Sequence, residues 1–500
     1  MSRLDLGRVL TVAAVLACVG PPLVVGLAGL GLPPVPAAIA VVLAFGAAAA
    51  FPRIPPLPLD AARRRPLVAA LWVLMVAAAS YQTVRASLFA YDPALSRYSV
   101  APGDPFRTEH CCLTAYAEAA RFAAEGRPVY DPGAYLPGGA RRRIGPLTVD
   151  PFHYPPPFLL LPSAVRLVAP DFLATRRVWF ALQAVVMAAG LLGVAWWVGG
   201  AAGSRMALLA PMLWGSPHTF FALQTGNFQT TAMVLALGGC LLAASSRTAA
   251  GAALLAGAAA AKLFPAVLVL HVVAWARVRL IAAIAVAGLG YVLVSLAVYG
   301  VGTWREFLVG ELPRLLSGEA FPQIRNPGNA VVNLSFFGLV AKLRGLGLAA
   351  MDYEAGRMFA RVCFVVIAAG AVWTGRRVGR LAPGGALERA PHAMLWLAVL
   401  NGAAFISPFV GVAYGGFGTA WLAVIAMAAA PARRARMAAL LAFVLLSVAL
   451  IAMPSPVPTR APEGWLLGAA LATQLVVLAV SAWAVSAWAG ARRPARAPSR

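Results

Sequence analysis

The sequence predicts an all-α polytopic membrane protein, and three observations favour this fold class. Of its 500 residues, 61% are hydrophobic and only 12% are charged, whereas about 25% of a typical soluble domain is charged. Apolar stretches of roughly twenty residues recur from end to end, each long enough to cross the hydrocarbon layer as a helix. Backbone amides inside that layer must bond internally, which requires helices. We expect a single integral-membrane domain, residues 1–500, with about 11–13 transmembrane helices.

The net charge of +24 comes largely from short arginine clusters between the apolar stretches, for example at residues 63–65 and 492–500. Such clusters are typical of cytoplasmic loops. They favour membrane lipids as partners, through anionic headgroups, and they argue against nucleic acid. Because both ends of the chain are basic, we expect a multi-pass protein of a bacterial inner (plasma) membrane with cytoplasmic N- and C-termini.

The first polar segment follows three expected spans, at residues 9–30, 34–51 and 67–90. It covers residues 91–155 and is predicted to be the first large extracytoplasmic loop. Residues 113–124 repeat apolar side chains at helical spacing, which predicts an amphipathic helix along the membrane surface.

Three aspartates of this loop each precede a proline, a pairing typical of turns. They are Asp92, Asp131 and Asp150. We therefore interpret them as turn residues.

The apolar pieces between residues 155 and 279 are less regular. The piece at 157–168 is short enough to be re-entrant. The piece at 249–274 is interrupted by AAKLFP, which predicts two short half-helices separated at Pro265. The remaining spans of this region are expected at 179–198, 206–223 and 230–244.

A span at residues 281–299 leads to the second large extracytoplasmic loop, residues 300–353. A partly apolar helix is expected inside it, at 331–343. The later spans are expected at 358–372, 392–412, 419–430, 437–453 and 465–488. This arrangement places both acidic loops on the same, extracytoplasmic side.

Four motifs occur in a fixed order: PFHYPPPFLLLP at 151–162, LQTGNFQTTAMVLAL at 223–237, AAGAALLAGAAAAKLFPAVLVL at 249–270 and NPGNAVVNLSFFG at 326–338. In these motifs the chain resembles glycosyltransferase family 87 of the GT-C superfamily, which includes polyprenyl-phosphate-dependent mannosyl- and arabinofuranosyltransferases. The resemblance covers most of residues 90–340. It implies a GT-C-like integral-membrane enzyme that moves a hexose or pentose, with inversion, from a polyprenyl-phosphate donor to a lipid or glycan acceptor at the extracytoplasmic face.

An inverting transfer needs a carboxylate that takes the proton from the acceptor hydroxyl. Many similar family members carry an acidic residue four positions before a tyrosine of the first outer loop. Here that position is Cys112, before Tyr116. Two catalytic candidates stay open: Glu109, on the same helical face as Cys112, and Asp104, in the GDPF turn. The alternative is that both carboxylates only solvate the loop.

A phosphate leaving group needs cations or hydrogen-bond donors that hold its charge. A lysine within an apolar stretch is a functional-site hypothesis, with snorkelling to the headgroups as the alternative. Amide and hydroxyl groups suit sugar hydroxyls, although helix capping explains single cases equally well. The substrate-binding candidates are His110, Arg107, His153, Tyr154, Gln224, Asn227, Lys262, Arg325, Asn333 and Ser335. No cofactor and no metal site is predicted, although the histidines and carboxylates permit a divalent metal.

Two other function classes remain. A transporter or lipid flippase places polar residues at the middle of the bilayer and shows paired repeats, whereas here the carboxylates concentrate in the outer loops. A non-catalytic relative is the second alternative, because Cys112 replaces the expected acid.

Overall fold

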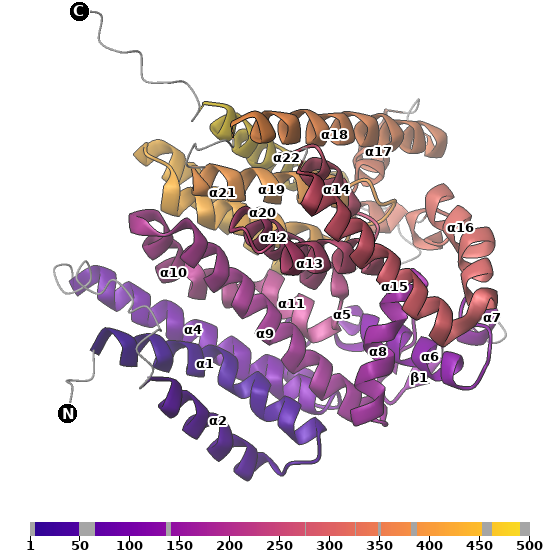
Figure 1. Cartoon of the computed structure of the whole chain (residues 1–500), viewed down its shortest axis with the longest axis horizontal. Helices are drawn as coiled ribbons and strands as arrows, with labels where there is room; N and C mark the ends of the chain where they lie inside the picture. The colour runs from indigo at the N-terminus through magenta and orange to yellow at the C-terminus, as the bar shows by residue number, and fades with distance from the viewer. Residues whose placement is uncertain are drawn as a thin grey trace, which may run out of the picture. The chain divides into compact units, whose positions relative to one another are not determined.

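The computed structural model describes residues 6–49, 66–136, 142–275, 277–325, 327–348, 352–381, 388–452 and 463–490. Within them the chain is almost entirely helical, with one two-stranded antiparallel sheet (Figure 1). The arginine clusters at 63–65 and 492–500 lie outside the described residues. The chain divides into two compact units. Unit 1 comprises residues 1–196, 204–231 and 294–311, and unit 2 comprises 197–203, 232–293 and 312–500. The single integral-membrane domain expected over residues 1–500 stays a prediction.

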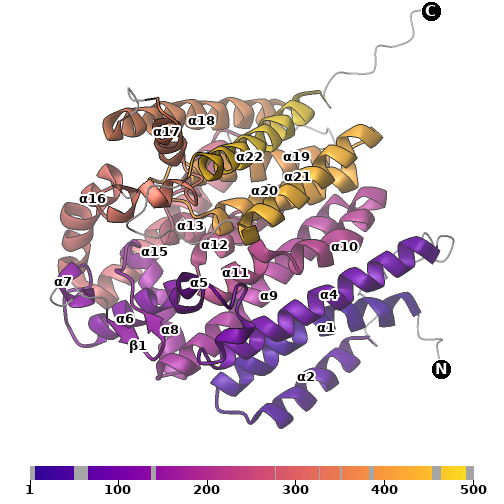
Figure 2. The same ribbon diagram turned by 180° about the vertical axis from the view of Figure 1, so that it is seen from behind.

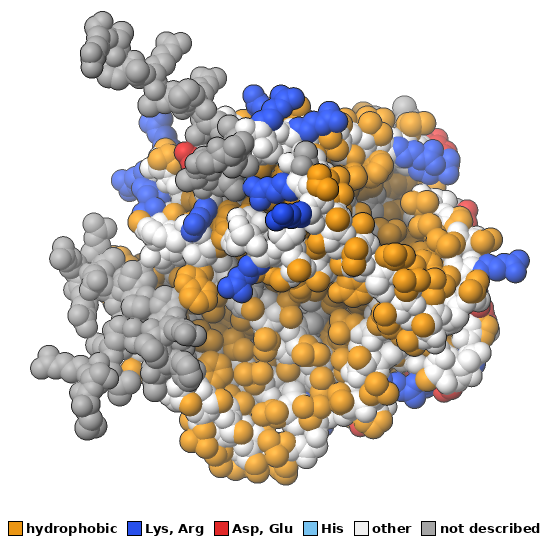
Figure 3. Space-filling view, viewed as in Figure 1, with side chains coloured by type: hydrophobic (Ala, Val, Ile, Leu, Met, Phe, Trp, Pro, Cys, Tyr) orange, Lys and Arg blue, Asp and Glu red, His pale blue; other side chains and the backbone are white. Residues whose placement is uncertain are grey.

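The helices confirm the all-α polytopic class. Eight helices in the described part of the chain are long and apolar enough to cross a membrane, or nine if one sharply bent pair counts as a span. Three further apolar helices are shorter, at Pro34–Ala47, Pro156–Val168 and Thr248–Ala261. Hydrophobic side chains dominate the face drawn in Figure 3. The long helices are fewer than the 11–13 expected because several predicted spans fold as short helices.

Unit 1 begins with three apolar helices that lie side by side in both views (Figures 1 and 2). These are α1 (Leu6–Gly29), α2 (Pro34–Ala49) and α4 (Pro66–Tyr91). Helix α1 also approaches α9 (Phe172–Val198) closely. A Cβ atom added at Gly26 would lie 2.4 Å from the Cβ of Ala181. Glycine is therefore what permits this contact, as in other membrane helix pairs.

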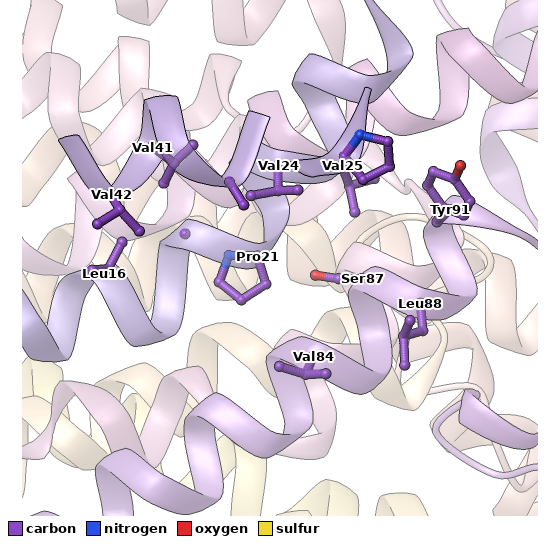
Figure 4. Close-up of a pocket in the computed structure, with 13 residues that line it drawn as sticks. Leu16, Pro21, Val24, Val25, Val41, Val42, Val84, Ser87, Leu88 and Tyr91 are labelled. Carbon is purple, nitrogen blue, oxygen red and sulfur yellow. The ribbon is translucent and has the colours of Figure 1, made fainter. Parts of the chain in front are cut away.

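A groove open to the surface lies among these first three helices (Figure 4). Its walls are almost wholly apolar, with side chains such as Val25, Val41 and Leu88 pointing into it. None of the candidate catalytic or substrate-binding residues lines it. The groove is therefore separate from the candidate polar residues.

The first polar segment, residues 91–155, contains several short elements where the structure describes it. Its elements are η1 (Ser96–Tyr98), α5 (Pro105–Glu109), α6 (Cys112–Ala124), α7 (Pro132–Tyr135), β1 (Arg143–Ile144) and β2 (Leu147–Thr148). Helix α6 confirms the helix predicted at 113–124, but it is more enclosed than a surface helix. Glu118, expected as a polar position, is only 7% exposed and pairs with Arg121 and Arg142.

The rest of unit 1 consists of α8 (Pro156–Val168), α9, the greater part of α10 (Gly200–Trp214), α11 (Pro217–Thr225), the start of α12 (Phe228–Ala244) and the end of α15 (Val278–Arg305) with the π-helix η3 (Glu306–Glu311). Helices α11 and α12 meet at an angle of 110°. Gly226 ends α11 in the left-handed conformation, with φ of 68°, which favours glycine. The chain thus makes a sharp corner between the spans expected at 206–223 and 230–244.

Unit 2 holds the remaining helices. They are the main part of α12, α13 (Thr248–Ala261), α14 (Ala266–Val273), the start of α15, α16 (Leu312–Ser317), η4 (Pro322–Arg325), η5 (Pro327–Ala330), α17 (Phe336–Gly345), α18 (Tyr353–Leu381), α19 (Arg389–Ala404), α20 (Val412–Ala429), α21 (Arg433–Ala452) and α22 (Gly464–Gly490). Lys262 and Pro265 separate α13 from α14, which confirms the predicted break. Helix α17 begins later than expected because Ser335 caps it.

Candidate functional site

The polar side chains of unit 1 gather where four segments come together: residues 104–116, 148–154, 224–228 and 306–311. The short strand β2 organises two of them. Thr148 forms an isolated bridge with His110, and its hydroxyl donates to the carbonyl of Glu109 (3.3 Å). Two residues further on, Asp150 therefore lies beside the start of α6, where its N–H donates to the Thr114 hydroxyl (3.3 Å).

A chain of four polar side chains results. Asp150 Oδ2 lies 3.1 Å from His110 Nδ1, so the two side chains form an ion pair when the imidazole is protonated. His110 Nε2 lies 3.3 Å from Cys112 Sγ. Asn227 Nδ2, from the α11–α12 corner, donates to the same sulfur (3.2 Å). The His110 ring also stacks on Phe106, with centroids 4.8 Å apart. Asp150 is thus a member of the site, and not only the turn residue that the sequence predicts.

The charges around His110 favour its protonated form. Burial lowers the pKa of His110, but Asp150 and the Cys112 sulfur raise it, and the net pKa is well above the ordinary value. Burial raises the pKa of the adjacent Cys111, and the nearby Arg176 guanidinium acts in the opposite direction. The cluster therefore contains a cationic imidazole next to a carboxylate and a thiol.

Two tyrosines close one side of the cluster. The hydroxyls of Tyr116 and Tyr154 are 2.6 Å apart, and the Tyr116 oxygen accepts from the backbone N–H of Phe228 (3.2 Å). Burial raises the pKa of both hydroxyls, so both are neutral at physiological pH. Tyr154 also stacks on Phe158, with centroids 4.6 Å apart. A rigid aromatic wall thus stands beside the polar groups.

His153 has a buried carboxylate partner. Its Nδ1 lies 2.6 Å from Oε1 of Glu311, the last residue of the π-helix η3. The Glu311 side chain is 2% exposed and that of His153 is 19% exposed. A buried carboxylate is costly without a charged partner, so this contact fixes the HYPPP segment against the end of α15.

The two predicted catalytic carboxylates occupy different environments. Asp104 caps α5, and its Oδ2 lies 3.3 Å from Nε of the buried Arg107. Gln224 donates to the Arg107 carbonyl and accepts from the N–H of Val100 (2.8 Å). Glu109 lies 3.1 Å from Arg143 in an exposed pair, with its side chain 38% exposed. Asp104 is therefore the more firmly held of the two.

A buried guanidinium lies in the same unit. Arg176, on α9, is 2% exposed, and none of its three nitrogens has a hydrogen-bond partner among the described residues. Its guanidinium lies 4.7 Å from the centroid of the Phe89 ring and interacts electrostatically with Cys111 and Asp92. Buried donors of this strength are normally paired. Arg176 therefore offers several unused donors near Cys111.

The family model of glycosyltransferase family 87 matches residues 152–395. Over these residues the chain is similar to the members of glycosyltransferase family 87. No curated protein and no solved structure matches the chain. The family 87 region includes His153, Asn227 and Glu311, so it contributes directly to the polar cluster of unit 1.

The family 87 region also includes the candidates that lie in unit 2. Lys262 ends α13 and is partly exposed. The Arg325 side chain lies outside the described residues. Asn333 donates to the Pro408 carbonyl (2.9 Å) and accepts from the N–H groups of Ser335 and Val410. The Ser335 hydroxyl caps α17. Asn333 and Ser335 therefore anchor the start of α17 within unit 2.

The sequence reasoning did not predict the site contacts of Asp150, Arg176 and Glu311. These contacts depend on partners far away in the sequence, such as His110 for Asp150 and His153 for Glu311. Within the described residues, no three His, Cys, Asp or Glu side chains lie close enough together to hold a metal ion.

Proposed function

We propose that the protein is an inverting glycosyltransferase with a GT-C-like fold. In this proposal it transfers a hexose or pentose from a polyprenyl-phosphate carrier to a lipid or glycan acceptor. The reaction takes place at the extracytoplasmic face of a bacterial inner membrane, with both chain termini in the cytoplasm. The observation that carries the proposal is the polar cluster of unit 1, whose second half lies within the family 87 region.

The proton acceptor in this proposal is Asp104. As the acceptor oxygen attacks the anomeric carbon, the carboxylate takes the hydroxyl proton, and the bond between that carbon and the phosphate oxygen breaks. Asp104 is favoured over Glu109 because α5 and Arg107 fix its position, whereas Glu109 faces an exposed arginine. A base must be held within hydrogen-bond reach of its substrate.

The leaving phosphate carries its charge away and needs no proton donor, only groups that stabilise it. Arg176 and His153 are our proposed partners for it. The unused donors of Arg176 match the planar geometry with which guanidinium groups bind phosphate. His153 is oriented by Glu311, and a protonated imidazole would add positive charge beside the phosphate. Lys262, Arg107 and Arg325 stay secondary proposals.

The sugar hydroxyls are proposed to bind amide and phenol groups of the cluster. Asn227 is held by two backbone contacts: its carbonyl accepts from Gln183 (2.9 Å) and its Oδ1 accepts from the N–H of Gln229 (2.7 Å). Tyr154 presents a neutral hydroxyl and an aromatic face. Gln224, in the same unit, is proposed to shape the site. Asn333 and Ser335 stay proposed substrate-binding residues of unit 2.

The test is sugar transfer in membranes that contain the full chain, with radiolabelled polyprenyl-phosphate mannose or arabinofuranose as donor. Asp104→Asn should lower the rate by about 10²–10⁴-fold, the usual contribution of a general base. Glu125→Gln is a matched control for Glu109→Gln, because the two side chains are 39% and 38% exposed. We expect both glutamine variants to keep the rate.

Three outcomes would contradict parts of this proposal. Full activity of Asp104→Asn together with loss in Glu109→Gln would move the base to Glu109. Full activity of both single variants and of the double variant would reject a carboxylate base in this loop. Movement of the labelled lipid across the membrane without a glycosylated product would favour a flippase.

A further inference from the structure

Cys112, His110 and Asp150 have the order of contacts found where a thiol is activated for attack: nucleophile, imidazole, orienting carboxylate. We propose that Cys112 is a reactive nucleophile that exchanges with small disulfides, so that position 112 is a covalent modification site. This chemistry is independent of the proposed sugar transfer.

The hydrogen-bond geometry carries the proposal. Cys112 Sγ lies 3.3 Å from His110 Nε2, the distance of a thiol that shares its proton with an imidazole. His110 Nδ1 faces Asp150 at 3.1 Å, which holds the ring with Nε2 toward the sulfur. Asn227 donates a second N–H to the sulfur (3.2 Å). Two donors aimed at one sulfur stabilise the thiolate more than the thiol, because only the thiolate is a strong acceptor.

The local backbone adds to this effect. Cys112 is the first residue of α6, where unpaired backbone N–H groups create a partial positive charge. Thiolates at the N-termini of helices and beside histidine or arginine are the reactive ones in proteins. Arg176 acts on the adjacent Cys111 from the α9 side, so a second positive charge lies in the same region.

Three other described groups near the sulfur are neutral: the Tyr116 and Tyr154 hydroxyls and the Cys111 thiol. Tyr116 and Tyr154 are near enough to interact electrostatically with it, and both are neutral because burial raises their pKa. Cys111 points to the Thr225 carbonyl (3.5 Å) and is neutral for the same reason. The remaining anion, Asp150, lies across the imidazole ring from the sulfur. Its charge is balanced by the imidazolium.

Exposure separates Cys112 from its neighbour. Cys111, Cys18 and Cys240 are buried, whereas Cys112 and Cys363 are partly exposed. Cys363 lies on α18, in the other unit. A small disulfide should therefore meet two thiols in the native chain, and only Cys112 has an imidazole within contact distance in the described part of the structure.

The exchange step is balanced without a further reactant. The Cys112 thiolate attacks one sulfur of the disulfide, and the new sulfur–sulfur bond forms as the old one breaks. The departing thiolate takes the proton that His110 received from Cys112. The products are a mixed disulfide at Cys112 and one small thiol.

The experiment follows the release of 4-thiopyridone from 4,4′-dithiodipyridine at pH 7, with the full chain in detergent and no sugar substrate. A free thiol with a pKa of about 8.5 is roughly 3% ionised at pH 7. Full ionisation, discounted for lower intrinsic nucleophilicity, gives about a tenfold gain in rate. We expect a fast phase of one thiol equivalent that Cys112→Ser abolishes.

The variants test the activation itself. His110→Gln should slow the fast phase about tenfold because the imidazole is lost. Asp150→Asn should slow it several-fold because the imidazole ring loses its orientation. Glu125→Gln is the control, because it removes an exposed carboxylate of the same helix region. It should leave the rate unchanged. Melting temperatures show whether each variant folds. If His110→Gln does not fold, Asp150→Asn decides alone.

Either of two results would overturn the proposal. In the first, the wild-type chain shows no fast phase that depends on Cys112. In the second, His110→Gln and Asp150→Asn react as fast as the wild type. Because no sugar is present, failure here leaves the proposed transfer reaction untouched, and an inactive transferase would leave this result untouched.

Discussion

Lys342 should make the stability of the protein depend on pH. It is fully buried in α17, where Nζ donates to the Asn333 carbonyl and to Oε1 of Gln474 (2.9 Å). Burial lowers its pKa from 10.5 to about 7. At about 1.4 kcal/mol for each pKa unit, the buried ammonium costs roughly 5 kcal/mol relative to the unfolded chain. The neutral amine avoids this cost.

The sign of the pH dependence follows from proton linkage. Between pH 7 and 10.5 the unfolded lysine holds a proton that the folded lysine has released. Stability therefore rises with pH in this window and becomes flat below pH 7, where both states are protonated. The melting temperature of the detergent-solubilised protein should increase from pH 7 to pH 9.

Lys342→Met removes this dependence. The variant loses the titrating group, but it leaves the Asn333 and Gln474 oxygens without their donor, at a cost of about 1–3 kcal/mol each. At pH 7 these losses offset most of the stability gained by removing the buried ammonium. At pH 9 they exceed the smaller cost of burying Lys342 in the wild type. Lys262→Met, the only other lysine, is the control. An equal increase in melting temperature from pH 7 to pH 9 in wild type and Lys342→Met would refute the reasoning.

Two further substitutions test the site. Gly226→Ala should destabilise the chain by about 2–4 kcal/mol, through left-handed strain and overpacking, since its Cβ would lie 3.0 Å from that of Leu113. Gly300→Ala, with similar φ and open space, should cost less in a denaturant titration, and equal costs would contradict the packing argument. Glu311→Gln should lower sugar transfer at least tenfold by weakening a charge-assisted hydrogen bond to His153, and unchanged activity would exclude this role.

Local sequence chemistry predicted much of the fold. Hydropathy identified the helical class, and the break at Pro265 and the corner at Gly226 follow from backbone preferences of single residues. Asp92 and Asp131 also behave as predicted, since each accepts from a backbone N–H two residues further on. These features depend on neighbours in the chain, and so the sequence alone contains the information.

The site was predicted only in part. His110, His153 and Asn227 were identified by residue type, but their partners were not. Asp150 reaches His110 because β2 pairs with the start of α6, and that pairing is not encoded in the DP dipeptide. The acid that the family resemblance implies at position 112 was recognised as missing, yet the contacts of Cys112 with an imidazole and an amide required the fold.

Glu311 shows why a polar segment is a poor guide to a solvated loop. The second outer loop was expected from residue 300 because glutamates follow there. The helix does break at Gly300, whose backbone is not helical (φ 75°), but helical structure resumes after it and runs through η3. In this π-helical turn Phe307 and Glu311 both face inward, whereas Leu308 and Val309 are exposed. Extra residues per turn shift the helix phase, so the apolar pair faces outward and the carboxylate reaches His153. Polarity therefore drew attention to Glu311 but predicted the wrong environment for it, because a partner 158 positions away in the sequence helps to make the buried charge tolerable.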